Sequence, residues 1–259
     1  MNTLLKSSLV AATISLATFA LAAAETPLHP TVRQIKLDIS NAFLIKSGNK
    51  NVLIDTGSKK DMPALEAALA KEGVSIENLN TVIITHGHND HAGLAAEIKR
   101  RSKAVLIAGE KDIGLIHAGH DEELKPTNLM GRILKRWAID PVYEGFSPDV
   151  LVNATLDLRP YGIAGQVVPM PGHTPGSLVI LLDDGRALVG DMMLGGWMNG
   201  AMFASSPGEH YFQNDLELNH ANIVDLLKKP IHTFYLGHGG PVTRDSILDG
   251  FNLTDPLAK

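Results

Sequence analysis

The sequence predicts an α/β fold of the four-layer αββα type, in which two sheets face each other and helices cover the outside. Its composition, with 44% hydrophobic residues and 24 glycines among 259, is typical of one globular domain with many tight turns. Strand-like and helix-like patterns alternate through the first half. The apolar segments Val52–Asp55 and Leu188–Asp191 both end in aspartate, a weak internal repeat that suggests two similar halves.

The first half begins with an antiparallel meander and continues as alternating strands and helices. Residues Val32–Ile39 alternate apolar and polar side chains with a period of two, as in a half-buried strand. A helix is expected at Pro63–Glu72, because proline opens it and Gly73 follows it. The other elements expected here are strands at Asn41–Lys46, Asn51–Ile54, Thr81–Ile84 and Ala104–Ala108, and a helix from about Ala92 to Arg101.

The stretch from about Glu110 to Phe146 breaks this alternation. Helical pieces at Lys111–His117 and Met130–Trp137 lie among glycines and prolines. Long irregular stretches are often loops that cover a substrate. A helical hairpin that only patches the sheet is an equal alternative.

The second half returns to strands. Asp183, Asp184 and Gly185 form a predicted hairpin turn, and the glycine-rich segment after Asp191 is expected to be a loop. The expected elements are strands at Leu151–Leu158, Gln166–Pro169, Ser177–Leu182, Arg186–Val189 and Thr233–Leu236, and helices at Gln213–Lys228 and Asp245–Asp249.

The first 24 residues have the features of a secretory signal peptide. Lys6 supplies a positive start, Leu9–Leu21 is apolar and uncharged, and Ala22–Ala24 offers the small residues of a cleavage site. About thirteen apolar residues are short against the roughly 20 that span a bilayer, which argues against a retained membrane anchor. We therefore expect a signal peptide at 1–24, one domain at 25–259, and a bacterial protein that is periplasmic or secreted.

Charge and cysteine content exclude some partners. The chain has 23 basic and 28 acidic residues, and removal of Lys6 with the signal peptide leaves 22 minus 28, or about −6. Such a chain without a basic run is a poor partner for nucleic acid or anionic lipid. It has no cysteine, so stability must come from burial and metal rather than from disulfides.

The segment Thr85–Gly93 concentrates metal-ligand side chains directly after a buried strand. It contains His86, His88, Asp90 and His91 within six positions. Imidazoles gathered in such a turn are costly unless a cation ties their lone pairs together, and Zn²⁺ accepts both imidazole nitrogen and carboxylate oxygen. The alternative, a solvated turn in which Asp90 caps a helix, needs one such residue rather than four. A metal site at this strand end is therefore predicted.

Three more candidate ligands follow apolar runs in the second half. They are His173, Asp191 and His238, each flanked by glycine, where the backbone can approach an ion closely. With the first cluster they make seven ligand-type residues, enough for two ions. The remaining histidines are expected to be surface or packing residues, namely His29, His117, His120, His210, His220 and His232.

With these motifs the sequence resembles the metallo-β-lactamase superfamily, which is marked by a His-x-His-x-Asp-His loop. The resemblance runs from Asp55 through His238 in the family's order. It implies an αββα sandwich with one ion held by His86, His88 and His173, a second held by Asp90, His91 and His238, and Asp191 bridging the two. It also implies that Asp55 orients a ligand loop by accepting hydrogen bonds, with a cap or turn acid as the alternative.

The ligand set implies a hydrolytic mechanism. Two divalent ions about 3.5 to 4 Å apart share a water and lower its pKa toward about 7. Asp90 is the candidate catalytic residue, placed to orient the resulting hydroxide and to pass its proton to the leaving group. Zinc is the expected metal, with iron and manganese as alternatives, because the same ligands accept all three.

Departures from known subfamilies narrow the substrate. True metallo-β-lactamases usually carry cysteine or serine at the position of Asp191, so the aspartate argues against dedicated β-lactam hydrolysis. The expected periplasmic location, where such enzymes meet their drugs, keeps a periplasmic β-lactamase as an alternative. Glyoxalase II enzymes share all seven ligands but add a glutathione-binding domain, and 21 residues follow His238 here. Acyl-homoserine lactonases resemble the Gly172–Gly176 segment but commonly place a tyrosine near the position of Leu194.

These comparisons favour a hydrolase of an ester, lactone or thioester bond in a small-molecule substrate. A mononuclear iron enzyme similar to persulfide dioxygenases is one alternative, and a metal-holding binding protein without turnover is another. A group of apolar residues near Asp191 is expected either to bind an acyl or aromatic part of the substrate or to cover the core. These residues are Met192, Met193, Trp197, Met198, Met202, Phe203, Tyr211 and Phe212.

Overall fold

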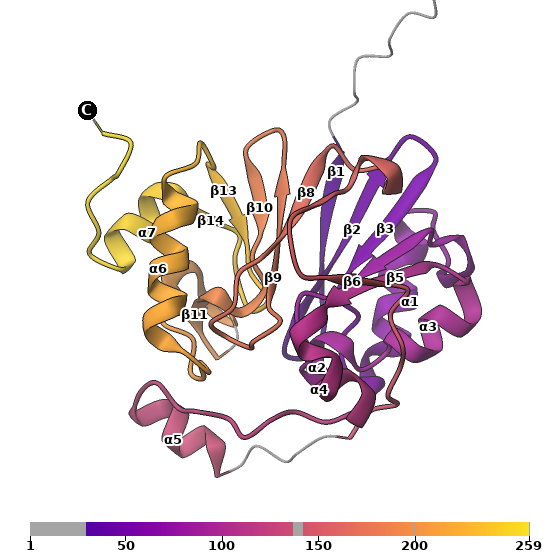
Figure 1. The fold of residues 1–259 in the computed structure, drawn as a ribbon, viewed down its shortest axis with the longest axis horizontal. Coiled ribbons are helices and arrows are strands. Elements are labelled where there is room, and N and C mark those ends of the chain that lie inside the picture. Colours follow the sequence, from indigo (N-terminus) through magenta and orange to yellow (C-terminus); the bar gives the residue numbers. More distant parts are fainter. Residues whose placement is uncertain (1–29, 137–141, 199, 259) are drawn as a thin grey trace, which may run out of the picture.

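A computed structural model describes residues 30–136, 142–198 and 200–258, so the predicted signal peptide at 1–24 lies outside the described residues. Two six-stranded sheets face each other, and helices pack on their outer sides (Figure 1). This arrangement confirms the predicted four-layer αββα sandwich. Over the described ranges, each helix is too short or too polar to cross a membrane.

The first sheet is an antiparallel meander that continues as parallel strands, in the order β1-β2-β3-β4-β5-β6. Its strands are β1 (Thr31–Lys36), β2 (Asn41–Ser47), β3 (Lys50–Ile54), β4 (Thr81–Ile83), β5 (Val105–Gly109) and β6 (Val150–Val152). The helices of this half are α1 (Met62–Lys71), α2 (Asn89–Ala92), α3 (Ala95–Ser102), α4 (Ile113–Ala118) and α5 (Leu129–Lys135).

The second sheet has the order β14-β13-β10-β9-β8-β7, with β10 and β13 parallel and the other neighbours antiparallel. Its strands are β7 (Leu156–Asp157), β8 (Gly165–Pro169), β9 (Leu178–Leu182), β10 (Arg186–Leu188), β13 (Thr233–Tyr235) and β14 (Val242–Thr243). A separate hairpin pairs β11 (Leu194–Trp197) with β12 (Met202–Gly208), and the helices are α6 (Leu216–Leu227) and α7 (Arg244–Gly250).

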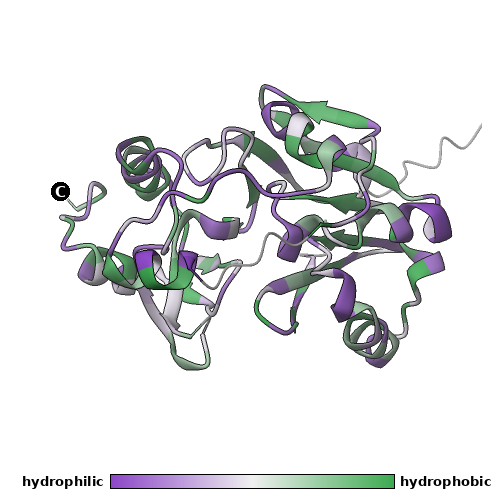
Figure 2. Ribbon diagram, turned by 90° about the horizontal axis from the view of Figure 1, so that it is seen from below, coloured by the Kyte–Doolittle hydropathy of each residue, from purple (hydrophilic) through white to green (hydrophobic). Residues whose placement is uncertain are grey.

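Three hydrophobic clusters account for the four layers. Successive side chains of a strand point to opposite faces. Accordingly, Leu44 packs outward beneath α1 and α3, whereas its neighbours Phe43 and Ile45 join Ile180 of the facing sheet. A third cluster fills the space between the second sheet and α6 and α7. In Figure 2 the strands are largely hydrophobic in colour, while the helices show both colours.

Three predicted elements differ from the structure. The strand expected at Leu151–Leu158 is split into β6 and β7, because a bend at Asn153 and Ala154 carries the chain from one sheet to the other. The helix expected at about Ala92–Arg101 is divided into α2 and α3.

The segment after Asp191 was expected to be a loop but contains the β11–β12 hairpin. Its glycines are needed for the strands to approach. A Cβ at Gly195 would lie 2.1 Å from the carbonyl oxygen of Ala204, and one at Gly196 would lie 2.1 Å from that of Met202. Glycine therefore marks close strand pairing here rather than a loop.

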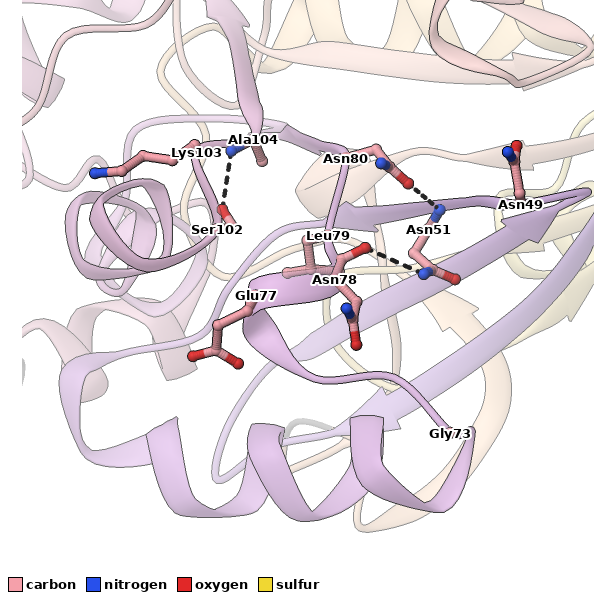
Figure 3. Close-up of a pocket in the computed structure, with 10 residues that line it drawn as sticks. All are labelled: Asn49, Asn51, Gly73, Glu77, Asn78, Leu79, Asn80, Ser102, Lys103 and Ala104. Atoms are coloured by element: carbon pink, nitrogen blue, oxygen red, sulfur yellow. Dashed lines mark hydrogen bonds between the residues drawn. The ribbon is translucent and has the colours of Figure 1, made fainter.

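At the amino ends of β3, β4 and β5 the surface has an open hollow of about 520 Å³ (Figure 3). It is lined by four asparagines, Asn49, Asn51, Asn78 and Asn80, together with Glu77 and Lys103 among others. The histidine-rich loop follows the carboxyl end of β4, so the hollow and the histidines lie at opposite edges of the first sheet.

Candidate metal centre

The candidate ligands come from four segments that reach one edge of the sandwich. Residues His86–His91 follow β4 and continue into α2, which lies at the lower edge in Figure 1. His173 follows β8, Asp191 lies in a short turn after β10, and His238 follows β13. Strands from both sheets therefore end at the same place, and each delivers ligand-type side chains there.

The structure brings all seven predicted ligands together. One group contains His86, His88 and His173, and another contains Asp90, His91 and His238. Within each group, ligand atoms lie within 4.8 Å of one another.

The Asp191 carboxylate lies between the two groups. Its Oδ2 is 3.8 Å from His86 Nε2, 3.6 Å from His173 Nε2 and 3.0 Å from His238 Nε2. Its other oxygen, Oδ1, is 3.3 Å from His91 Nε2. One carboxylate therefore contacts members of both groups.

Hydrogen bonds at Nδ1 orient four of the rings. His91 Nδ1 lies 2.9 Å from Asp55 Oδ2, His173 Nδ1 lies 3.0 Å from the carbonyl oxygen of Phe212, and His238 Nδ1 lies 2.6 Å from that of Ile39. His86 Nδ1 is 3.0 Å from Thr85 Oγ1. A ring that donates from Nδ1 keeps its lone pair on Nε2, so these contacts aim four lone pairs at the centre.

Asp55 organises the histidine loop. It adopts a left-handed backbone conformation with φ of 56°. Its carboxylate accepts from the Thr85 backbone N–H at 2.7 Å and the Thr85 hydroxyl at 2.8 Å, besides His91. This confirms the expectation that Asp55 orients a ligand loop, and it does so from a buried position.

In His88 the two ring nitrogens exchange roles, so that Nδ1 rather than Nε2 faces the other ligands. Its Nε2 lies 3.1 Å from Glu122 Oε2, and its Nδ1 lies 3.0 Å from His173 Nε2. Burial alone would lower the pKa of His88. The hydrogen bond to Glu122 and the charges of Asp121, Glu122 and Asp90 outweigh it and raise the pKa to about 9. A histidine with a carboxylate behind it is a typical arrangement around a metal.

Asp112 holds two ligand loops together. One of its oxygens accepts from the Gly87 backbone N–H at 2.9 Å and the Thr174 hydroxyl at 2.6 Å, and the other accepts from Gly176 N–H at 2.6 Å. Gly87 lies between the first two histidines, and Thr174 follows His173. Burial raises the pKa of Asp112, so three donors are needed to hold its charged form there.

The residues present fit a bound cation. His86 Nε2, His91 Nε2 and Asp191 Oδ1 are buried and have no hydrogen-bond partner. A Cβ at Gly237 would lie 1.9 Å from Asp191 Oδ1, so only glycine leaves room for this carboxylate. Burial lowers the pKa of His86 and His173 well below the usual value, which keeps these rings in the neutral form that binds metals.

The charge of Asp191 also suits such a centre. Burial raises the pKa of its carboxyl, but His238, His91 and His210 outweigh that effect and hold the pKa well below its usual value. The carboxylate is therefore ionised, and its charge in turn raises the pKa of His91 and His238. Unpartnered buried atoms of this kind call for an explanation, and a divalent ion supplies one.

Sequence reasoning missed His210, which was expected to be a surface or packing residue. It is buried, and its Nε2 lies 3.3 Å from Asp191 Oδ2. It forms a further potential metal-binding group with His173 and Asp191. Its sequence setting offers little signal, because no apolar run directly precedes it and no glycine is adjacent to it.

Glu122 and His210 reach the centre through one long-range pairing. The irregular stretch around Lys125–Asn128 runs beside 210–214, with Gln213 N–H donating to the Lys125 carbonyl at 3.0 Å and Thr127 N–H to that of Tyr211 at 3.0 Å. We call residues 120–136 the strap. Residues 122–125 of the strap line a narrow crevice together with His88 and His173.

The apolar residues near Asp191 divide into two sets. Met192 and Met193 are buried in the outer core of the second sheet. Four others on the β11–β12 hairpin are exposed, namely Trp197 (61%), Met198 (69%), Met202 (47%) and Phe203 (73%). Met192 and Met193 therefore cover the core, Tyr211 and Phe212 are half-buried, and substrate binding by the exposed four stays a prediction.

Known proteins resemble this chain in sequence and in fold. The family model described as the metallo-beta-lactamase superfamily matches residues 35–238. The Bacillus subtilis protein "Probable metallo-hydrolase YflN" is 24% identical over 230 residues, covering 82% of this chain and 85% of that protein. A "Hydroxyacylglutathione hydrolase" of Anaeromyxobacter dehalogenans is 30% identical over 152 residues, 58% of this chain.

Some matches cover only part of the relative. The chain spans 45% of that hydroxyacylglutathione hydrolase and 47% of a Drosophila melanogaster "Beta-lactamase-like protein 2 homolog", which is 27% identical over 171 residues and 60% of this chain. Among solved structures, "BLEG-1 B3 metallo-beta-lactamase" superposes with a TM-score of 0.61 over 87% of this chain and 98% of that one. At 21% identity this likeness shows the fold alone.

Proposed function

The chain belongs to the metallo-β-lactamase superfamily, and on that premise we propose that it is a dinuclear hydrolase of an ester, lactone or thioester bond. Family membership supports a metal-dependent hydrolase. The number of ions, the metal and the bond cleaved are our proposal. Zinc is the expected metal, with iron and manganese as alternatives.

The position of Asp191 carries the proposal of two ions. Its oxygens lie within 3.8 Å of imidazole nitrogens from both ligand groups, so one carboxylate can serve two cations. In this assignment His86, His88 and His173 hold the first ion, and Asp90, His91 and His238 hold the second. When bound, such a pair lowers the pKa of a shared water toward about 7 and polarises a carbonyl group.

Asp90 is the proposed catalytic residue. Its Oδ2 lies 3.4 Å from His238 Nε2 and 3.7 Å from His91 Nε2, at the margin of the second group. Its side chain is 17% exposed, whereas those of His91 and Asp191 are almost fully buried. It is therefore the ligand best placed to meet solvent, to accept a hydrogen bond from the attacking water and to return the proton to the leaving group.

The surroundings suggest the kind of substrate. The four exposed apolar residues lie on the β11–β12 hairpin, which begins three positions after Asp191, and can contact an acyl or aromatic group. The relative named hydroxyacylglutathione hydrolase is the reason to include thioesters among the proposed substrates. The predicted signal peptide, outside the described residues, leads us to propose a periplasmic or secreted location.

The proposal is tested by turnover assays on purified, metal-analysed protein. The panel contains a β-lactam, a homoserine lactone, an aryl ester, a thioester and a phosphodiester. We expect two divalent ions per chain and fastest turnover of the ester, lactone or thioester. One iron per chain would contradict the dinuclear centre, and fast β-lactam turnover with slow ester and lactone turnover would contradict the substrate class.

A further inference from the structure

His210 is buried beside three of the predicted ligands, His173, His238 and Asp191. It lies between β12 and α6, outside the seven predicted ligands, and is 7% exposed. Its ring centroid is 4.8 Å from that of His173 and 5.4 Å from that of His238. Its Nε2 is 3.3 Å from Asp191 Oδ2.

The same carbonyl oxygen anchors His210 and His173. The oxygen of Phe212 lies 2.9 Å from His210 Nδ1 and 3.0 Å from His173 Nδ1. Both rings can therefore donate from Nδ1 to one backbone atom and turn Nε2 toward Asp191. With the proton on Nδ1, two lone pairs, of His210 Nε2 and Asp191 Oδ2, face each other at 3.3 Å, which is unfavourable unless a cation lies near both.

We propose that His210 is an additional protein ligand of the metal centre and acts together with His173 and Asp191. The inference rests on the metal centre of the proposed function but not on its hydrolytic activity. The ion next to His173 then has five candidate protein ligands, namely His86, His88, His173, Asp191 and His210.

The competing arrangement has a different tautomer. The Phe212 backbone N–H lies 3.2 Å from His210 Nδ1 and can only donate. If that contact prevails, the proton is on Nε2 and His210 donates a hydrogen bond to Asp191 instead of binding an ion. The shorter distance to the Phe212 oxygen favours the ligand arrangement, and the two arrangements predict different spectra.

The strap holds the backbone of His210 in place. The Thr127 hydroxyl donates to the His210 carbonyl oxygen at 2.7 Å, and Thr127 N–H donates to the next carbonyl, that of Tyr211. Thr127→Ala should therefore loosen this ligand without touching the ion. Thr127→Ser, which keeps the hydroxyl, should restore it.

The test loads the full chain with Co²⁺ and measures uptake, affinity by chelator competition, and the visible absorption of the bound ion. His210→Ala is compared with His220→Ala, an exposed histidine that contacts Glu209. We expect His210→Ala to weaken one Co²⁺ by about tenfold or more and to change the spectrum, and His220→Ala to do neither. Thr127→Ala should give a smaller loss of the same kind.

A measurement on the unchanged protein does not depend on how the variant folds. Proton NMR of the Co²⁺ form counts the imidazole N–H groups shifted by the ion. We expect six, from His86, His88, His91, His173, His210 and His238. A count of five, or an unchanged affinity and spectrum in His210→Ala, would overturn the inference alone, whereas no Co²⁺ uptake by the unchanged protein would overturn the proposed function as well.

Discussion

The two edges of the first sheet both gather polar side chains at strand ends, but they treat them differently. At the hollow, Asn80 Oδ1 accepts from Asn51 N–H at 2.8 Å, and Asn51 Nδ2 donates to the Asn78 carbonyl at 3.1 Å. Likewise, the Ser102 hydroxyl donates to the Ile98 carbonyl oxygen and accepts from the Ala104 backbone N–H. These polar side chains therefore form hydrogen bonds with the backbone around the strand ends.

At the opposite edge several polar atoms converge, and three of them have no hydrogen-bond partner. His86 Nε2, His91 Nε2 and Asp191 Oδ1 are buried and unpartnered there, although the crevice beside His88 is far smaller than the hollow. Convergent and unsatisfied polar atoms therefore indicate a binding site better than open volume does. The predictions below test this difference, beginning with the largest effect.

Removal of the shared carboxylate should have the largest effect. Asp191→Asn keeps the size of the side chain but loses the negative charge that faces both ligand groups. We expect metal content to fall toward one ion or none and turnover to fall more than about 100-fold, beyond the loss typical of residues that only orient a ligand. Metal analysis and steady-state kinetics measure both. The exposed Asp157→Asn is the control, and full metal content in Asp191→Asn would contradict the bridging role.

Filling the space beside Asp191 should have the next largest effect. The Cβ of Gly237→Ala would lie 1.9 Å from Asp191 Oδ1 and 2.8 Å from His91 Cε1, so the carboxylate must move. Overpacking of this kind costs about 1 to 3 kcal/mol, or roughly 5- to 150-fold in affinity if the cost falls on metal binding. Chelator competition measures that loss.

The matched control for this change lies in a helix. A Cβ at Gly114 in α4 would meet nothing within 4 Å. Gly114→Ala should leave metal affinity unchanged and stabilise the fold by about 0.5 to 1 kcal/mol. Equal metal affinity in Gly237→Ala and Gly114→Ala would show that the space beside Asp191 is not critical.

The His88–Glu122 contact should make metal binding depend on pH. The raised pKa of His88, about 9, means that the metal-free protein holds a proton there at pH 7. A metal must displace this proton, and the pKa values of His91 and His238 are raised as well, so affinity should rise with pH up to at least about pH 9. The stability of the metal-free fold should depend on pH in the opposite direction. Protonated His88 stabilises that fold fully below pH 6.5, and this contribution is lost as the pH rises through 9.

Glu122→Gln separates these effects. It removes the hydrogen-bonded charge that helps to raise the pKa of His88, so the part of the rise in affinity that comes from His88 should end at a lower pH. It should also weaken metal binding by about 10- to 100-fold, as is usual when the group behind a ligating histidine is changed. Chelator competition between pH 6 and 9.5 measures both. Glu123→Gln, at an exposed residue that contacts Lys135, should match the unchanged protein, and an unchanged pH curve in Glu122→Gln would refute the coupling.

The parts of the centre that were predictable are local in the sequence. The run Val82–Ile84 indicates a buried strand by itself, and four ligands follow within six positions, so the histidine loop needs no tertiary information. His173, Asp191 and His238 could be added because each follows a short apolar run and is flanked by glycine. Their grouping into two sets came from the family resemblance.

The parts that were not predictable depend on long-range pairing. Glu122 and His210 are 88 positions apart and come to the centre only because the strap runs beside 210–214, where neither segment has a regular pattern. The β11–β12 hairpin was missed because Gly195 and Gly196 lower its strand propensity, although close strand approach requires them.

The smallest effects are expected at the hollow. Asn80→Ala removes the oxygen that accepts from Asn51 N–H, which should cost about 1 kcal/mol of unfolding free energy because the contact is exposed to water. Asn49→Ala is the matched control: Asn49 lines the same hollow, and within the described residues no hydrogen bond of its side chain is found. Urea denaturation should separate the two variants, while metal content and turnover stay unchanged in both. A change of metal content or turnover in Asn80→Ala would mean that the two edges are coupled through β4, and that paired asparagines do more than close the strand ends.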